Sequence, residues 1–236
     1  MRLRDLIDKS HCIVALTGAG ISTAAGIPDF RGEKGIYSLG LYDPYRTFDI
    51  EYFKRDPSYF FQFAREFLKA YGDIKPTKGH MFLAQLERIG KVKVVITQNI
   101  DGLHQMAGSS NVIELHGSFR KGRCLSCGKE YDLDWMKKNL IERGGLYCEC
   151  GGVVKPNVVF FGEPVIGMDE AMAYAHSADL FLVLGSSLTV QPASLLPYLT
   201  SGKVVIINKG ECLFPVEKAE MVINDDIDSV VERLQW

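Results

Sequence analysis

The chain has 236 residues, of which 47% are hydrophobic and 24% charged, a balance typical of a folded globular protein. A chain of this length buries a large core, which excludes a disordered chain, a collagen-like fibre and a small scaffold held by disulfides. The net charge of −2 shows no basic excess, so we expect no direct binding of nucleic acid.

Strands and helices alternate along most of the chain. Apolar runs of strand length recur at residues 12–16, 92–96, 111–115, 180–184, 204–207 and 221–223. Several are continuous rather than alternating, which is typical of strands buried on both faces of a parallel sheet. Between them, Asp56 and Pro57 begin a helix that runs to Gly72, and Thr77 caps another that stops at Gly90. The pattern predicts a doubly wound, Rossmann-like α/β domain.

A glycine-rich turn follows the first apolar run. Gly18 and Gly20 lie between the buried strand and a helix that we expect to begin near Ser22. Such a turn brings backbone N–H groups and a helix N-terminus up to a phosphate. It is equally typical of a tight strand-to-helix turn that needs glycine dihedrals. Because Thr23 occupies the third glycine position of the dehydrogenase fingerprint, a hydride-transfer enzyme is disfavoured.

Polar side chains follow several of the predicted strands. The strand at 92–96 is followed by amide and carboxylate side chains, and the strand at 111–115 is followed by a histidine and a glycine. Ligands bind at this carboxyl edge in doubly wound sheets. A lone histidine is more often structural than catalytic, but this position favours a role in the site. The strand ends together predict a long nucleotide groove, built from Gln98, Asn99, Asp101, His116, Gly185, Ser186 and Asn208.

A cysteine cluster interrupts the strand–helix pattern. Four of the six cysteines lie at Cys124, Cys127, Cys148 and Cys150, and thiolate tetrads favour tetrahedral zinc in a structural role. The second pair is one residue closer than the usual two-residue spacing, so a metal-free or redox pair is the alternative. We predict a small zinc-binding domain at 120–155, inserted into a discontinuous large domain of residues 1–119 and 156–236.

Short motifs in this order resemble the sirtuin family of NAD-dependent protein lysine deacylases. They are Gly18–Ser22, Gly26–Arg31, Thr97–His104, His116–Gly117, Phe161–Glu163 and Gly185–Ser187. The resemblance implies a Rossmann-like domain, a zinc-bearing small domain, and a cleft between them where NAD meets an acylated lysine. The reaction that it implies gives nicotinamide, free lysine and O-acyl-ADP-ribose.

The resemblance also implies roles for single residues. His116 would be the general base that activates a ribose hydroxyl of NAD, and imidazole suits that task near neutral pH. Asn99 and Asp101 would complete the catalytic set beside nicotinamide. Phe30 would shield the reactive carbon from water. The expected NAD contacts are Gly18, Ala19, Gly20, Thr23, Ile27, Phe30, Arg31, Gln98, Asn99, Ile100, Asp101, Gly185, Ser186, Ser187 and Asn208. For Asn208, a turn that ends a strand explains the residue equally well.

The apolar segment ending in Phe161–Glu163 would form one side of the acyl-lysine tunnel, although it is also typical of a core strand. Val159 C=O would accept a hydrogen bond from the N–H of the acylated side chain. The peptide backbone would pair with the chain near Gly162 and Glu163 on one side and with residues 188–190 on the other. Ala64 and Phe67 stand where desuccinylases of the family carry tyrosine and arginine, so we expect acetyl or longer apolar acyl groups. The expected substrate contacts are Val159, Phe160, Phe161, Gly162, Glu163, Leu188, Val190, Ala64 and Phe67.

Other functions remain open at this point. Mono-ADP-ribosyl transfer would use the same NAD site, whereas an NAD-sensing or zinc-ribbon module would bind NAD without releasing nicotinamide. A redox role through Cys148 and Cys150 is a third alternative. No apolar run approaches the roughly 20 residues that span a bilayer, and the charged N-terminal segment is unlike a secretion signal. We expect a cytoplasmic monomer that acts on acylated-lysine proteins and does not bind membranes.

Overall fold

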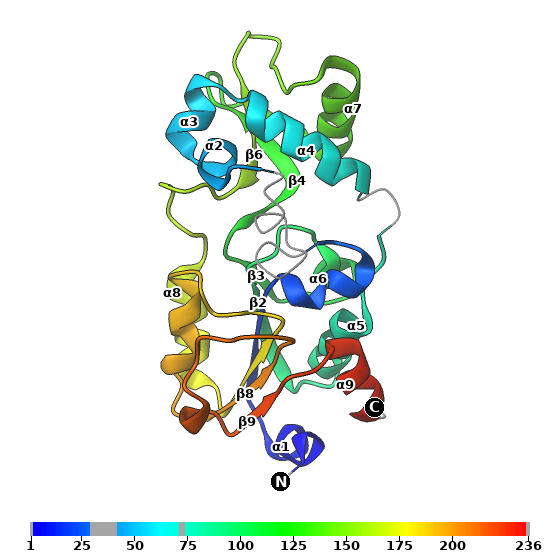
Figure 1. Ribbon diagram of the computed structural model, residues 1–236, viewed down its shortest axis with the longest axis vertical. Helices are drawn as coiled ribbons and strands as arrows, with labels where there is room; N and C mark the ends of the chain where they lie inside the picture. The colour runs from blue at the N-terminus through cyan, green and yellow to red at the C-terminus, as the bar shows by residue number, and fades with distance from the viewer. Residues whose placement is uncertain (1, 29–41, 71–73, 235–236) are drawn as a thin grey trace.

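A computed structural model describes residues 2–28, 42–70 and 74–234. These residues form two lobes stacked along the long axis, a large lobe that carries both termini and a small lobe above it (Figure 1). No helix among them is both long and apolar enough to cross a bilayer.

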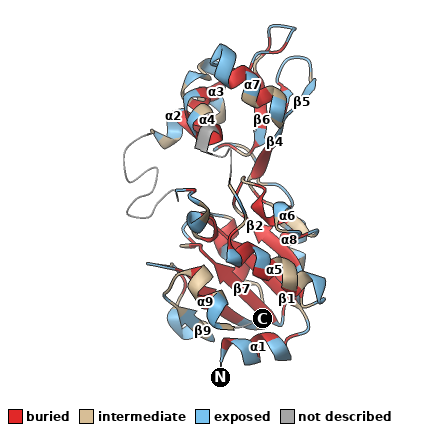
Figure 2. Cartoon of the chain, turned by 90° about the vertical axis from the view of Figure 1, so that its right-hand side faces the viewer, coloured by how far each residue is buried: buried red, intermediate tan, exposed pale blue. Residues whose placement is uncertain are grey.

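The large lobe is built on a six-stranded parallel sheet in the order β3-β2-β1-β7-β8-β9. Every strand predicted from an apolar run is present; the four central strands are buried along nearly their whole length, whereas the two edge strands are partly exposed. The strands are β1 (Ile13–Thr17), β2 (Val92–Thr97), β3 (Val112–Glu114), β7 (Leu180–Leu184), β8 (Lys203–Ile207) and β9 (Met221–Ile223). All residues of β1 and β7 are buried (Figure 2).

Helices cover both faces of this sheet, which confirms the doubly wound fold. One face packs against α1 (Leu3–Lys9), α5 (Lys78–Arg88) and α9 (Ile227–Leu234). The other packs against α8 (Met168–Ser177) and the 3₁₀ helix η3 (Ala193–Tyr198). Thr77 caps α5 as predicted, its hydroxyl accepting from His80 N. The chain adds β2 and β3 on one side of β1, and then β7, β8 and β9 on the other side. Ligands bind where the strand order switches sides in this way, so the carboxyl ends of β1, β2 and β7 are the expected place for a ligand.

The segment after β1 differs from the prediction. In place of a helix beginning near Ser22 the chain forms two 3₁₀ turns, η1 (Ala19–Ile21) and η2 (Thr23–Ala25). Gly26 has a φ of 89° and ends the second turn in the left-handed region, where a helix cannot continue. Two short elements elsewhere complete the lobe, α6 (Leu103–Met106) and η4 (Val216–Lys218).

The small lobe carries a three-stranded antiparallel sheet in the order β5-β4-β6. Its strands are β4 (Gly117–Cys124), β5 (Glu130–Asp132) and β6 (Val154–Val158). The helix α7 (Leu133–Arg143) lies between β5 and β6 in the chain. Three helices that come before β2 in the chain pack on the same core, namely α2 (Pro44–Phe48), α3 (Ile50–Arg55) and α4 (Ser58–Ala70).

The boundary drawn from the sequence places these three helices in the NAD-binding domain. In the structure Phe53, Phe60 and Phe63 share one core with Met136 and Phe160 of the small lobe. Their aromatic side chains cover the apolar face of the small sheet, which otherwise lacks enough chain to bury it. We propose to count residues 44–70 with the small lobe.

Candidate functional site

The loops that follow β1 and β7 are locked together by glycines. Gly20 N donates to Gly185 O at 2.9 Å, and Gly18 N donates to Leu184 O at 3.1 Å. A Cβ on Gly18 would lie 2.7 Å from Gly185 O, and a Cβ on Gly20 would lie 2.7 Å from Gly185 Cα. Gly185 itself has a φ of 65°. Only glycine fits at these positions, and the loop backbone therefore approaches the site without side chains.

A polar network joins the ends of β1 and β2. Asn99 Nδ2 donates to Gly18 O and to Ser22 Oγ, both at 3.1 Å. Ser22 Oγ donates to Asp101 Oδ2 at 2.7 Å, and Leu103 N donates to Asp101 Oδ1 at 2.9 Å. Burial raises the pKa of the Asp101 carboxyl, while these donors oppose the shift. The network holds an amide and a carboxylate side by side, as predicted from the strand ends.

His116 stands at the end of β3, and its ring is oriented by the end of β2. His116 Nδ1 lies 2.9 Å from Gln98 O. A carbonyl oxygen only accepts, so Nδ1 carries the proton and Nε2 keeps a free lone pair. Burial lowers the pKa of His116, and the Gln98 carbonyl partly offsets that effect. Near neutral pH the ring is therefore a neutral imidazole whose Nε2 can take a proton.

A second hydrogen bond of Gln98 reaches β7. Gln98 Nε2 donates to Ser186 Oγ at 2.9 Å, and Leu188 N donates to the same hydroxyl at 3.3 Å. The ends of β2 and β7 are thus tied across β1. Leu188 has a φ of 55°, which a non-glycine residue rarely adopts. Such a strained residue is typical of a functional site, where the surrounding contacts hold it in place.

The segment after β6 lies directly against His116. Val159 N donates to His116 O at 2.9 Å, and Phe161 N donates to Phe48 O at 2.7 Å. The Val159 carbonyl oxygen accepts no hydrogen bond from the described residues, so it is available to a ligand. Phe160 is buried in the aromatic core, whereas Phe161 is exposed. Of the two residues expected to wall the tunnel, Phe160 therefore faces the interior.

The two positions expected to set acyl preference lie in the same apolar core. Ala64 is fully buried, and Phe67 stacks on Phe119 with ring centroids 5.2 Å apart. Ile100 and Phe160 belong to that core as well. Ala64 and Phe67 thus both contribute apolar surface to this core.

The remaining expected contacts lie in loops of both lobes. Ile27 is buried, whereas Thr23 is exposed and its hydroxyl donates to Gly20 O at 3.0 Å. Ser187 Oγ lies 3.0 Å from Thr189 Oγ1, Ala19 and Val190 are half-buried, and Gly162 and Glu163 follow Phe161. Asn208 Nδ2 donates to Glu211 O at 3.1 Å, which supports its role in a turn. Phe30 and Arg31 lie outside the described residues.

Two buried histidines support this site and were not predicted from the sequence. His80 Nε2 lies 3.5 Å from Ser22 Oγ, and His104 Nε2 lies 2.9 Å from Thr17 Oγ1. Their ring centroids are 4.6 Å apart. Burial lowers the pKa of His80 to about 4, so its ring is neutral at pH 7. Isolated histidines in a helix or loop carry no pattern that separates such a role from core packing.

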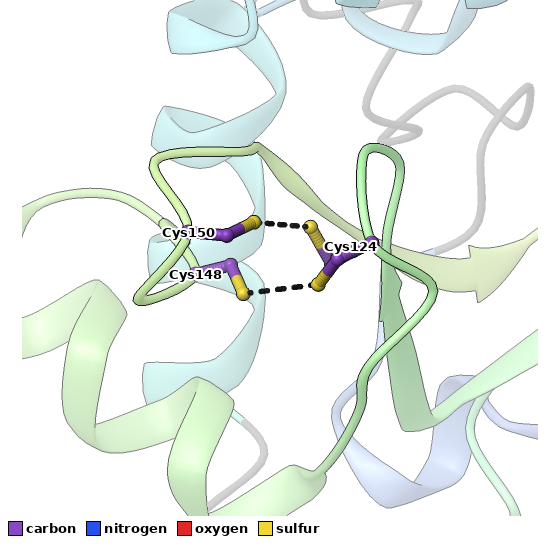
Figure 3. Close-up of side chains that lie close together, drawn as sticks. Cys124, Cys148 and Cys150 are labelled. Atoms are coloured by element: carbon purple, nitrogen blue, oxygen red, sulfur yellow. Dashed lines mark hydrogen bonds between the residues drawn. The ribbon is translucent and has the colours of Figure 1, made fainter.

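The four clustered cysteines converge from two loops of the small lobe (Figure 3). Their sulfur atoms all lie within 4.8 Å of one another, with Cys124–Cys150 at 3.6 Å and Cys127–Cys148 at 3.5 Å. Those separations exceed the about 2.05 Å of a disulfide. They approach the about 3.8 Å expected between thiolates that are each about 2.3 Å from a tetrahedral zinc ion. The donor set therefore fits zinc and leaves no coordination position open for catalysis.

The short spacing between Cys148 and Cys150 is accommodated by the glycines that follow. Gly151 has a φ of 81°, and Cys148 N donates to Gly152 O at 2.8 Å. A Cβ on Gly152 would lie 2.7 Å from Cys124 Sγ, so this loop closes only with glycine. Tyr131 donates its hydroxyl proton to Cys148 Sγ at 3.0 Å and lowers the pKa of that thiol to about 6. The loop thus brings the sulfur atoms of Cys148 and Cys150 to the cluster despite its short spacing.

Known proteins resemble this chain over nearly its whole length. Residues 18–192 match the sequence model of the Sir2 family. An NAD-dependent protein deacetylase of Sulfurisphaera tokodaii is 46% identical over 233 residues, which cover 96% of this chain and 91% of that protein. A solved Sir2 histidine-to-alanine variant with a deacetylated p53 peptide and 3′-O-acetyl-ADP-ribose matches with a TM-score of 0.93 and 42% identity, covering 98% and 95% of the two chains. A structure of Sir2Tm bound to a propionylated peptide matches with a TM-score of 0.87 and 41% identity, covering 98% and 94%.

Proposed function

The chain belongs to the Sir2 family, and we infer that it is an NAD-dependent protein deacetylase. It consumes NAD and acetyl-lysine and releases nicotinamide, lysine and O-acetyl-ADP-ribose. The observation that carries this conclusion in the site is the pairing of His116 with Val159. One backbone hydrogen bond, Val159 N to His116 O at 2.9 Å, holds the residue that carries the neutral imidazole beside the residue whose carbonyl accepts no hydrogen bond from residues 2–28, 42–70 or 74–234.

We propose the following roles for the residues at the sheet edge. His116 Nε2 accepts a proton from a ribose hydroxyl, because Nδ1 is occupied by Gln98 O. Asn99 and Asp101 hold the nicotinamide end, and the glycine turn after β1 admits the phosphates close to backbone N–H groups. When bound, NAD supplies an electrophilic ribose carbon with nicotinamide as its leaving group. Ser186 and Ser187 line the part of the groove toward β7.

We propose that the acylated lysine enters between Val159 and the strand-end residues Leu188–Val190. Val159 C=O would accept the side-chain N–H of the acylated lysine, and main-chain pairing near Gly162 would tolerate many peptide sequences. The buried Ala64 and Phe67 support acetyl and short apolar acyl groups. The propionylated peptide in the Sir2Tm structure is consistent with that range. A succinyl carboxylate buried there without a cation would be costly.

We also propose that the chain works as a monomer in a compartment that keeps thiols reduced, as the cytoplasm does. All six cysteines are free thiols, and the clustered ones must be reduced to bind metal. Light scattering after size-exclusion chromatography tests the monomer, since a mass of twice 26.3 kDa would contradict it.

The test of the function is nicotinamide release from NAD in the presence of an acetyl-lysine peptide. Wild-type protein should release nicotinamide only with peptide, and His116→Ala should lower the rate by about 10²–10⁴-fold, the range of general-base catalysis. His176→Ala is a matched control, because His176 is exposed on α8. Release that needs no peptide would point to NAD hydrolysis or ADP-ribosyl transfer. NAD binding without release would instead indicate a binding module.

A further inference from the structure

Lys155 on β6 is a buried ammonium group that the proposed reaction does not use. Lys155 as a whole is only 8% exposed to solvent. Lys155 Nζ donates to Val158 O at 2.6 Å and lies 2.8 Å from Glu163 Oε2. It also stands 4.2 Å from the centre of the Phe160 ring. Burying a cation is costly unless its partners are well placed. Apart from a longer contact with Pro156 O at 3.5 Å, the partners of Lys155 all belong to one short segment, 158–163.

The carboxylate of Glu163 extends this contact to the backbone. Glu163 Oε2, which faces Lys155 Nζ, also accepts from Phe160 N at 2.8 Å. The turn is closed on its other side by Glu163 N, which donates to Phe160 O at 3.0 Å. Gly162 has a φ of 91° within this turn. The ion pair between Lys155 and Glu163 therefore connects the two ends of the segment 158–163, because Lys155 also binds Val158 O.

This ion pair controls the two peptide planes on either side of Val159. In the first plane, Val158 C=O is held by Lys155 and Val159 N–H by His116 O. In the second plane, Phe160 N–H is held by Glu163. A trans peptide points its C=O and N–H in opposite directions. The Val159 carbonyl must therefore point away from Glu163, and within the described part of the chain no donor reaches its oxygen.

We propose that Lys155 is a positioning residue that orients the Val159 carbonyl toward the N–H of the acylated lysine. This inference rests on the proposed function. It assigns Lys155 to peptide recognition and not to NAD binding, because none of its contacts with the described residues lies in the loops after β1, β2 or β7. A purely structural ion pair would instead support fold stability and both substrates alike.

The experiment compares Lys155→Met, Lys155→Arg and Glu163→Gln in the zinc-loaded full chain. The KM of an acetyl-lysine peptide and the KM of NAD are measured separately, together with the Kd of a fluorescent acetyl-lysine peptide. Lys155→Met should raise the peptide KM and Kd by about tenfold or more, the factor that corresponds to about 1.4 kcal/mol. The NAD KM should stay within about twofold, and Lys155→Arg should restore most of the peptide affinity because it keeps the charge. Lys121→Met is the control, since Lys121 lies exposed on β4, 3.9 Å from Glu130.

A folded Lys155→Met protein with wild-type peptide Kd would overturn the inference, and so would equal increases in both KM values. If Lys155→Met does not fold, Glu163→Gln decides, because it keeps an acceptor for Phe160 N but removes the charge that faces Lys155. It should weaken peptide binding, and unchanged peptide binding would refute the proposal. Failure of the proposed deacetylase function is distinguishable from failure of the Lys155 inference. In that case the wild-type protein itself would release no nicotinamide in response to peptide.

Discussion

Replacing Asp101 with asparagine removes one charge from the network between β1 and β2 while leaving the shape of the side chain almost unchanged. Asparagine keeps an oxygen for Leu103 N but presents an NH₂ donor to Ser22 Oγ, which now donates to Asp101 at 2.7 Å. Ser22 Oγ already accepts from Asn99 at 3.1 Å. It would then receive two donors, and its own proton would have no acceptor there, because His80 Nε2, 3.5 Å away, carries the ring proton while Nδ1 accepts from Thr77 N at 3.2 Å.

The size of the effect follows from the bond that is lost. A hydrogen bond to a charged group contributes about 1.5–3 kcal/mol. At about 1.36 kcal/mol for each factor of ten, we expect kcat/KM for NAD to fall roughly 10- to 150-fold. The peptide KM should change little, because none of the hydrogen bonds of Asp101 reaches the segment 158–163.

The pH dependence of stability should change as well. Burial raises the pKa of Asp101 in the folded state, so the folded protein binds this proton more tightly than the unfolded chain does. Wild-type stability therefore falls as pH rises from the unfolded pKa, about 3.9, through the higher folded pKa. Asparagine has no proton to lose. The stability of Asp101→Asn relative to wild type should thus rise across that window and remain higher above it.

Two measurements check this prediction together. Steady-state nicotinamide release gives kcat/KM for NAD, and urea unfolding at several pH values gives the stability difference. Asp169→Asn is a suitable control, because Asp169 is exposed in the first turn of α8. A folded Asp101→Asn protein with kcat/KM within about twofold of wild type would refute the proposed role of the network. A variant that loses stability with rising pH as wild type does would refute the pKa argument.

Three further predictions concern metal, packing and acyl choice. Chelation of zinc, or Cys150→Ser, should lower the free energy of unfolding by on the order of 3 kcal/mol or more. For a chain of this size that corresponds to about 6–12 °C in melting temperature. Calorimetry tests this, and an unchanged melting temperature of the metal-free protein would contradict the zinc assignment. Gly18→Ala should destabilise by about 1–3 kcal/mol and raise the KM of NAD, because its Cβ would meet Gly185 O at 2.7 Å; unaltered urea unfolding would exclude this clash. Phe67→Arg should shift the ratio of succinyl- to acetyl-peptide turnover toward succinyl, and a wild-type preference for succinyl would already disprove the apolar pocket.

The sheet and the metal centre were predictable because local patterns record them. A strand buried on both faces must be continuously apolar, and β1, β2 and β7 are read directly from such runs. Polar residues at the carboxyl ends of parallel strands must share one edge, which brought Asn99, Asp101 and His116 together. Clustered cysteines in a chain without a disulfide pattern indicate metal, even where Cys148 and Cys150 are spaced unusually.

Long-range packing decided what the local patterns could not. The aromatic residues of α4 have the periodicity of any amphipathic helix, and only the tertiary structure shows that they cover the small sheet. The turn after Gly20 resembles a helix start until its close approach to Gly185 is known. Lys155 is an ordinary lysine in the sequence, and its burial beside Glu163 depends on a turn that brings them to 2.8 Å. The amino-acid order thus determined the strands, the strand-end chemistry and the metal ligands, because each depends on neighbours in the chain. Tertiary contacts alone determined which core the helices α2, α3 and α4 join and which nitrogen of His116 is protonated, because each depends on partners distant in sequence.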